Sequence, residues 1–155
     1  MSSGNASRRA LLPRGAYYPV APTVSLIFPF PTTLAMHVIN LEEKFGQFTD
    51  QWHPHIIADL NDQHVKLARV RGEFIWHNHE AEDELFIVVK GQLHIDFRGD
   101  HTATLNPGEL LVVPRGVEHR PHAVEETWIM LVEPQATRHT GTVEHALTRH
   151  ALPRI

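Results

Sequence analysis

The sequence predicts an all-β domain of the sandwich or barrel class, and two observations support this prediction. First, roughly nine short runs of apolar and β-branched residues follow one another between residues 55 and 132. Turn-forming residues separate these runs about every 8–12 residues, which is the spacing typical of such folds. Second, hydrophobic residues make up 42% and charged residues 21% of the 155 residues, an ordinary globular composition with room for one domain.

The first 35 residues differ from the rest of the chain in composition. They hold five of the eleven prolines and three arginines but no acidic residue. Because proline prevents a helix and interrupts a strand ladder, we expect residues 1–35 to form a flexible or loosely docked extension. We expect a barrel over residues 36–135 and a polar C-terminal tail over residues 136–155. A chain that starts at Met36 would fit the same composition.

One short helix is expected at the start of the barrel. Leu41, Phe45 and Phe48 have the spacing of apolar residues on one helix face. Asn40 suits the N-cap, and Glu43 follows three residues later as in a capping box. The pattern therefore predicts a helix from Leu41 to Phe48.

Each predicted strand is a short run that is apolar throughout or alternates between apolar and polar residues. Turn signals such as Asn61-Asp62 and Gly99-Asp100 separate these runs. The predicted strands cover residues 55–60, 64–70, 73–79, 84–90, 92–98, 101–105, 109–113, 117–122 and 127–132.

Two of these strands are apolar on both faces, over residues 85–89 and 110–113. A strand of this kind is covered on both sides. Its outer face must therefore lie under a second sheet, the N-terminal helix or another subunit. Together with the large apolar side chain of Trp76, this pattern predicts a homodimer.

Charge and cysteine content exclude several classes of protein. Acids outnumber bases 18 to 14, and the net charge of −4 argues against a nucleic-acid partner. The absence of cysteine excludes disulfides, cysteine zinc sites, iron–sulfur clusters and thiol nucleophiles. No apolar run approaches the roughly 20 residues that span a bilayer, so we expect no membrane partner and a cytoplasmic location.

Histidine is the unusual residue, with 13 in the chain. His77 and His79 lie two apart on a predicted strand, so both imidazoles point to the same face. Glu84 begins the next predicted strand, and a short turn would bring its carboxylate to the same point. Two imidazoles and a carboxylate suit a metal ion. In a histidine-rich chain, however, such a pair alone is more often coincidence, and the acidic run around Glu84 is more often a solvated turn.

The wider spacing of these residues resembles the two motifs of the cupin family. The first motif is matched by Gly72, four residues, His77-x-His79, four residues, Glu84, six residues and Gly91. The second is matched by Gly108, five residues, Pro114-x-Gly116, two residues and His119. The two matches together fix nine positions, which is far more specific than a lone His-x-His.

The match departs from the family pattern at two places that are not normally ligands. The first motif usually has five residues between its glycine and its first histidine, and here there are four. The second motif usually ends in asparagine, and here that place is Ala123. The chain looks most like the small single-domain bacterial cupins that are called mannose-6-phosphate isomerase-like.

This resemblance implies a double-stranded β-helix, the jelly-roll cupin barrel, with a metal ion in its mouth. Carried over residue by residue, the implied ligands are His77, His79, Glu84 and His119. Three imidazoles and one carboxylate imply one divalent transition metal per chain, which is Mn, Fe, Ni, Co, Cu or Zn.

The implied function is that of a metal-dependent enzyme on a small polar metabolite, isomerase-like with a sugar or sugar phosphate as substrate. Two alternatives stay open: an iron-dependent dioxygenase, and a non-enzymatic module that binds a small ligand. The fold does not decide among them, because it hosts many functions. The candidate phosphate contacts are Arg71, Arg98, Arg115 and Arg120.

Strand alternation predicts the surroundings of the ion. The expected inner face holds Glu73, Ile75, Phe86 and Val88, and Phe74 and Trp76 are expected to point outward. The candidate acid or base groups beside the ligands are Glu73, His94, Arg98, Glu109 and His122, although each is better explained as a surface residue or a strand-end residue. The histidines outside the motifs that we expect on the surface are His53, His55, His64, His139, His145 and His150.

Overall fold

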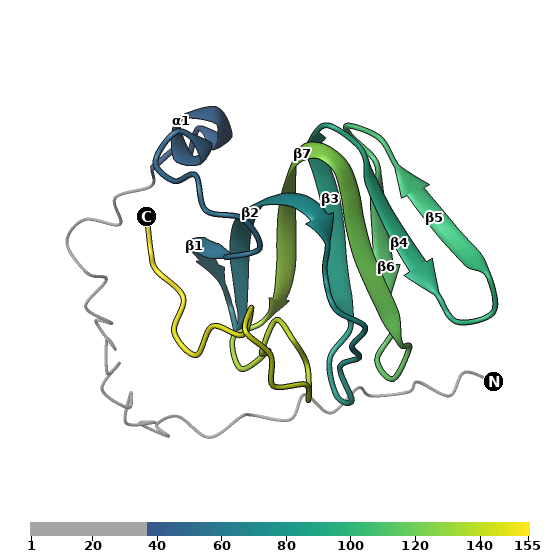
Figure 1. Ribbon diagram of the computed structural model, residues 1–155. Helices are drawn as coiled ribbons and strands as arrows, with labels where there is room; N and C mark the ends of the chain where they lie inside the picture. The colour runs from purple at the N-terminus through teal and green to yellow at the C-terminus, as the bar shows by residue number, and fades with distance from the viewer. Residues whose placement is uncertain (1–36) are drawn as a thin grey trace, which may run out of the picture. The chain divides into compact units, whose positions relative to one another are not determined.

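The computed structural model describes residues 37–155, so the extension predicted over residues 1–35 lies outside the described residues. Among the described residues a single helix, α1 (Leu41–Phe45), precedes seven strands (Figure 1). The strands are β1 (His55–Leu60), β2 (Gln63–Glu73), β3 (Glu84–Lys90), β4 (Leu93–Phe97), β5 (His101–Leu105), β6 (Leu110–Val113) and β7 (His119–Pro134). The predicted all-β class is confirmed.

The strands form two facing layers that share the long strand β7 (Figure 1). The first layer has the order β1-β2-β7-β3-β6. In the second layer, β4 pairs with β5 on one side and with the first residues of β7 on the other. The later residues of β7 pair with β2 and β3. Because β7 passes from one layer to the other, the two layers close into the expected jelly-roll barrel.

The main core lies between the two layers. The first layer contributes Ala68, Val70, Phe86, Val88, Ile129 and Leu131, and the second contributes Leu93, Ile95, Leu105 and Ala123. All of these side chains are buried, and the inward direction predicted for Phe86 and Val88 is confirmed. Burying such side chains between two sheets is the main favourable contribution to folding.

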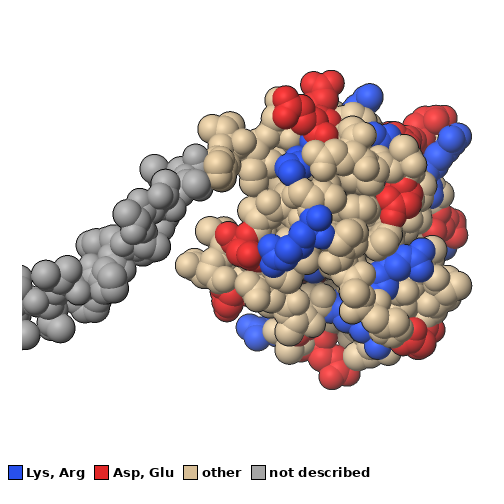
Figure 2. All heavy atoms as spheres, turned by 90° about the vertical axis from the view of Figure 1, so that its left-hand side faces the viewer, with Lys and Arg blue, Asp and Glu red and all other residues tan. Residues whose placement is uncertain are grey.

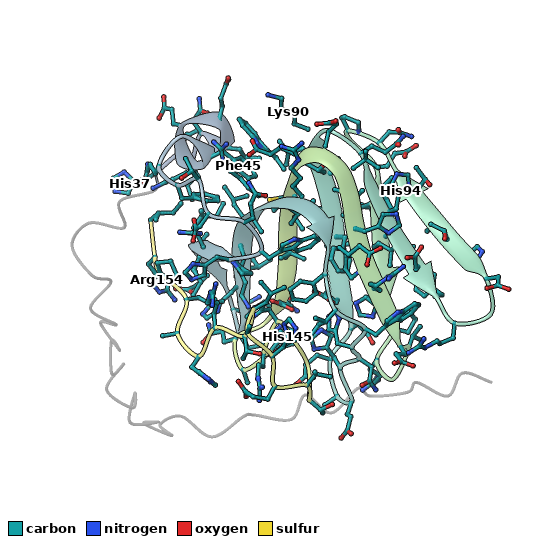
Figure 3. The ribbon with its side chains drawn as sticks, in the orientation of Figure 1. His37, Phe45, Lys90, His94, His145 and Arg154 are labelled. Atoms are coloured by element: carbon teal, nitrogen blue, oxygen red, sulfur yellow. The ribbon has the colours of Figure 1, made fainter. Side chains whose placement is uncertain are left out.

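Helix α1 covers part of the outer face of the first layer. Asn40 is the N-cap, as predicted, and its side chain accepts a hydrogen bond from Glu43 N at 3.2 Å. Phe45 points from the helix toward the sheet (Figure 3) and stacks on Trp128 with ring centroids 4.6 Å apart. Val89 packs against the same cluster. The helix is therefore one of the covers that the doubly apolar strands require.

Two of the strand predictions are wrong. The strand expected over residues 73–79 is absent, because β2 ends at Glu73 and the chain then runs irregularly to β3 except for one bridge at His77. The strands expected over residues 117–122 and 127–132 are one continuous strand. Its exposed residues at 124 and 125 lie where β7 changes layers and do not mark a break.

Residues 136–155 have the expected irregular course, but they pack against the barrel. Thr140 and Thr148 are buried, and their hydroxyl oxygens lie 3.0 Å apart. Ile56 N donates to Pro153 O at 2.8 Å, and Ile155 N donates to Ile56 O at 3.1 Å. Residues 37–155 form one compact unit. Over these residues, no helix is long and apolar enough to cross a membrane.

Candidate metal centre

Four side chains from three segments meet inside the barrel. His77 and His79 lie on the irregular segment between β2 and β3, whereas Glu84 begins β3 and His119 begins β7. All four residues are buried, and one ligand atom from each lies within 4.8 Å of the others. The set that the motifs implied is therefore brought together in space.

Backbone hydrogen bonds hold these segments beside one another. His77 N donates to His119 O at 3.0 Å, and His119 N donates to His77 O at 2.9 Å. Gly116 N donates to His79 O at 2.6 Å. Gly116 has a φ of 77°, which glycine adopts at little cost and other residues rarely adopt. Gly116, from the second motif, thus forms a turn whose backbone holds His79, from the first motif, in position.

The orientation of two of the imidazoles is set by their own backbone. His77 Nδ1 lies 3.1 Å from Ile75 O, and His119 Nδ1 lies 3.0 Å from Val117 O. A carbonyl oxygen only accepts, so each Nδ1 carries a proton, and the neutral ring presents its unprotonated Nε2 to the centre. Histidine ligands in metal sites are held in this way.

The Glu84 carboxylate lies among these nitrogens. Glu84 Oε2 is 3.1 Å from His79 Nε2, 3.1 Å from His119 Nε2 and 3.9 Å from His77 Nε2. A neutral imidazole that donates through Nδ1 directs a lone pair at this oxygen, which is unfavourable unless a cation lies between them. In addition, His77 Nε2 is buried without a hydrogen-bond partner among the described residues. These residues therefore fit a metal ion.

Burial and the charge of Glu84 decide the protonation of the site. Burial lowers the pKa of His77 to about 4, although the Glu84 charge opposes this. Burial also acts to lower the pKa of His79, but the hydrogen bond to Glu84 and its charge outweigh it and raise that pKa above its ordinary value. Burial acts to raise the pKa of Glu84, yet its close contacts with the His119 and His79 rings hold that pKa well below its usual range. The centre thus offers an ionised carboxylate to a cation.

The donor set narrows the identity of the ion. Three imidazole nitrogens and one carboxylate oxygen suit Mn, Fe, Co, Ni, Cu or Zn better than Ca or Mg. Four protein ligands close a tetrahedral zinc site, whereas an ion that prefers six ligands keeps positions for water or substrate.

A cavity of about 30 Å³ adjoins the centre and is lined by His77 and Glu84. Its other walls are mostly apolar, and they consist of Trp52, Pro54, Ala68, Val70, Phe74, Phe86, Pro121, Ile129, Leu131 and His139. The outward direction predicted for Phe74 is wrong, because Phe74 is buried and its ring meets that of His77 edge-on. Strand alternation does not apply there, since the segment is not a strand.

The candidate acid or base groups beside the ligands lie elsewhere. Glu73 and Arg98 form ion pairs at the surface, with Arg120 and Glu118 respectively. His94, labelled in Figure 3, stacks on His122 with ring centroids 4.9 Å apart. Glu109 accepts a hydrogen bond from the backbone of Asn106 in a turn. The structure therefore places each of the five as a surface or half-exposed residue.

Two histidines expected on the surface are buried. His55 stacks on Phe48 with ring centroids 4.0 Å apart. His139 lines the cavity, and its Nε2 lies 2.9 Å from Leu147 O. Both positions depend on packing between segments that are distant in the sequence, so local pattern did not reveal them.

An ion pair inside the barrel escaped sequence reasoning. Lys66 and Glu133 are buried, and Lys66 Nζ donates to Glu133 Oε1 at 2.6 Å. Burial and the charge of Glu84 raise the pKa of Glu133 to about 7, although Lys66 opposes this. A signal was present: Lys66 lies two residues before the core residue Ala68, and Glu133 lies two residues after Leu131. Alternation places both inside the barrel.

Comparison with known proteins agrees with this fold. A family model for the cupin domain (Cupin_2) matches residues 63–134. The chain is 43% identical over 94 residues to the uncharacterised protein YdbB of Bacillus subtilis, and the match covers 61% of this chain and 77% of that protein. The crystal structure of a cupin-2 domain containing protein from Shewanella frigidimarina is similar, with 51% identity, a TM-score of 0.62 and coverage of 63% of this chain and 95% of that one. A protein of known structure from Neisseria meningitidis is 29% identical, with a TM-score of 0.59 and coverage of 64% of this chain and 100% of that one.

Proposed function

This chain belongs to the cupin family, and we propose that it is a metal-dependent enzyme acting on a small metabolite. His77, His79, Glu84 and His119 hold one divalent transition metal ion in this proposal. When bound, such an ion supplies Lewis-acid polarisation of a substrate oxygen or, if it is iron, redox chemistry with dioxygen.

The observation that carries the proposal is the arrangement around Glu84. The nearest nitrogens of three imidazoles lie 3.1 to 3.9 Å from one carboxylate oxygen, in a buried place. The His77 and His119 rings are turned by their own backbone so that an unprotonated nitrogen faces this oxygen. A barrel that needed only stability would gain more from apolar side chains at these positions. The cost of burying them is offset only when a cation is bound.

The protein contributes orientation and exclusion of water. Phe74, Phe86 and Leu131 are among the walls that surround the cavity beside the ligands. They keep bulk water from the side of the centre that faces the core, which strengthens electrostatic interactions there. A substrate oxygen would approach the ion from outside this cavity, because its volume of about 30 Å³ holds no more than a water-sized molecule.

Isomerisation of a sugar phosphate is one candidate reaction, but the surroundings of the centre give it little support. Among the described residues that line the cavity there is no arginine. Each arginine that could hold a phosphate lies near an acid, and the pairs are Arg71–Glu125, Arg98–Glu118, Arg115–Asp83 and Arg120–Glu73. A free sugar or another neutral substrate is more compatible with this site.

The cavity favours an iron-dependent dioxygenase as the second candidate. Its volume of about 30 Å³ suits a diatomic or a single water-sized molecule, and its walls are mostly apolar. Dioxygen is small and apolar, so it would partition into such a space beside the ion. The chain would then keep the gas and the metal ion side by side.

We propose a small-molecule partner and no nucleic-acid partner. On the face shown in Figure 2, basic and acidic side chains are interspersed over the described residues. A nucleic-acid interface usually concentrates basic residues along one face.

Metal content tests the centre. We expect elemental mass spectrometry of the tag-free protein, after dialysis against each candidate ion, to find an ion bound at this centre. Replacement of His77 or His119 by alanine should remove that ion, whereas His94→Ala should retain it, because His94 lies on the outer face. No bound ion after reconstitution would contradict the proposal.

Two substrate-free measurements separate enzyme from binding module. The proton relaxation rate of water should rise when the protein is loaded with Mn²⁺, since an open position exchanges water quickly. An unchanged relaxation rate would indicate a closed metal site and favour a module that only binds a ligand.

Nitric oxide, used as a dioxygen substitute, should give a spin-3/2 electron paramagnetic resonance signal with Fe²⁺-loaded protein if the dioxygenase candidate is correct.

A further inference from the structure

A second group of metal-ligating side chains lies in the loop before β1 and at the first residue of that strand. Asp50, His53 and His55 each offer one ligand atom, and these atoms lie within 4.8 Å of one another. We call this group the Asp50 cluster. It shares no residue with the centre at Glu84, so an ion bound there would be additional to the proposed function.

His55 in this cluster is oriented in the same way as the ligands of the first centre. Its Nδ1 lies 2.8 Å from His53 O, the carbonyl two residues earlier. His77 and His119 make the same contact with Ile75 O and Val117 O. The neutral His55 ring therefore directs its unprotonated Nε2 toward Asp50, whose Oδ1 lies 3.7 Å away.

The ring of His55 is also held rigidly. It is 6% exposed and stacks on Phe48 with centroids 4.0 Å apart. A ligand that is already fixed loses little side-chain entropy when an ion binds.

The loop that carries the cluster has an unusual backbone. Trp52, between Asp50 and His53, has a φ of 54°, in the left-handed region that non-glycine residues rarely adopt. Two hydrogen bonds hold it there, from Trp52 N to Arg69 O at 2.9 Å and from Trp52 Nε1 to Arg71 O at 2.9 Å. This fixed turn brings Asp50 back toward the two histidines.

The remaining ligand positions are open to water. The Asp50 side chain is 44% exposed and makes a short contact with His53 Nδ1. An exposed carboxylate can turn to admit an ion, and water can complete the coordination. Two imidazoles and one carboxylate with open positions form a donor set for divalent transition ions. We propose that Asp50, His53 and His55 form a second binding site for such an ion, with Zn²⁺ as its simplest probe.

A nearby pair shows what distinguishes the cluster from an ordinary ion pair. His64 Nε2 lies 3.4 Å from Asp59 Oδ1, which resembles the His55–Asp50 contact. However, Asp59 is already bound by the Arg154 guanidinium at 2.7 and 3.0 Å, and no second histidine joins it among the described residues. This pair lacks the third donor and carries a cation where a metal ion would lie, so it serves as the matched control.

The test is zinc stoichiometry by equilibrium dialysis and elemental mass spectrometry on the tag-free full chain. The unmodified chain should bind two Zn²⁺ ions. Asp50→Asn and His55→Ala should each bind one, and His64→Ala should still bind two. Thermal unfolding of each variant checks that it folds, and Asp50→Asn is the safer variant because the side chain is half-exposed.

The two sites are told apart in the background of His77→Ala. That variant should retain one Zn²⁺, and the combined His77→Ala, Asp50→Asn variant should retain none. Loss of all zinc in His77→Ala alone would overturn the second site while supporting the first. Retention of two ions by folded Asp50→Asn would also overturn it. If the centre at Glu84 binds no ion, the zinc content of His77→Ala should instead equal that of the unmodified chain.

Discussion

Histidine orientation in this protein is set largely by local backbone contacts. His55, His77 and His119 each bond Nδ1 to the carbonyl oxygen two residues earlier. Since the bonded nitrogen carries the proton, the other nitrogen of the neutral ring is left free to bind a metal. The backbone contacts therefore orient Nε2 of each ring in the absence of a bound ion.

Removal of a single ligand should abolish tight metal binding. We expect His77→Ala, His119→Ala and Glu84→Gln to weaken affinity by at least about 100-fold, since loss even of a supporting hydrogen bond costs 10–100-fold. Competition with a chromogenic chelator measures this. His94→Ala, on the outer face, should leave affinity within about twofold of the unmodified chain. Equal losses in all four variants would indicate a general effect on folding.

Metal binding at the centre should release a proton. The pKa of His79 is raised, mainly because contact with Glu84 outweighs burial, whereas burial lowers the pKa of His77 to about 4. A protonated His79 must therefore lose its proton before the ion binds, whereas at neutral pH the neutral His77 ring has no extra proton to lose.

The affinity should accordingly rise with pH until the pH exceeds the pKa of His79 and then level off. Calorimetry in two buffers of different ionisation enthalpy should find a proton released with each ion below the pKa of His79, falling toward none as the pH rises past that pKa. An affinity that does not change from about pH 6 to about pH 8 would contradict this assignment.

At the residue scale, the motifs were more informative than strand alternation. The spacing of the two motifs identified His77, His79, Glu84 and His119, and the structure brings them together. Phe74 was assigned the wrong face because strand alternation was applied to a segment that is not a strand. His139 reaches the cavity only through the fold of residues 136–155, which no local pattern encodes.

Among the elements, the C-terminal segment bears directly on the ligands. Gly141 has a φ of 56°, and a Cβ there would lie 1.9 Å from Asn78 O, in the residue between the two histidine ligands. His139 of the same segment lines the cavity with His77. The segment thus supports the loop on which His77 and His79 lie.

Gly141→Ala should therefore both destabilise the fold and weaken metal binding. Gly99→Ala is the matched control, because Gly99 also has a positive φ, of 86°, but has nothing within 4 Å of its Cβ position. We expect backbone strain of about 1 kcal/mol in both variants, and about 1–3 kcal/mol more in Gly141→Ala from the clash. Denaturant unfolding and chelator competition measure the two effects. Equal behaviour of the two variants would show that the segment does not support the loop.

The buried pair between β2 and β7 is a further test at this scale. Lys66→Met leaves Glu133 without its counter-charge beside Glu84, and loss of one partner of a buried pair costs about 3–5 kcal/mol. The double change Lys66→Met, Glu133→Leu should recover most of that loss.

The pH dependence of the Lys66→Met variant follows from the sign of the shift. The pKa of Glu133 is already raised to about 7, and loss of Lys66 raises it further. The folded state then holds a proton that the unfolded state releases, so stability should fall as the pH rises above the ordinary pKa of a glutamate. Urea unfolding of chelator-treated protein at two pH values checks this. A loss of stability that is the same at both would contradict it.

For the whole molecule, the fold class and most strands could be predicted because turn residues separate the runs clearly. The predicted limits of β1, β3 and β5 are confirmed to the residue. The division of β7 was wrong because a strand that crosses between two layers exposes residues midway and still continues its ladder. Pairing order and the closure of the barrel depend on contacts between distant strands, and one sequence does not display them.

The homodimer stays a prediction, and the structure narrows where its interface would lie. Trp76 does not require a partner, because Arg98 lies 3.8 Å from its ring centroid. Strand β6 is different: among the described strands it pairs only with β3, and Leu110 and Val112 on it are 60% and 48% exposed. An apolar edge strand of this kind is a site for pairing with another chain.

We therefore expect a second copy to cover β6. Sedimentation velocity should give a dimer for the unmodified chain and a monomer after Leu110→Lys and Val112→Lys are combined, because two buried lysines would each meet the charge of the symmetry-related copy. Val124→Lys is the control, since Val124 is also exposed but lies on β7. If the unmodified chain sediments as a monomer, the homodimer prediction is wrong, and the apolar edge of β6 would then need a different partner. If the variant with both lysines is still a dimer, the interface lies on another surface, and Leu110 and Val112 remain exposed in the dimer.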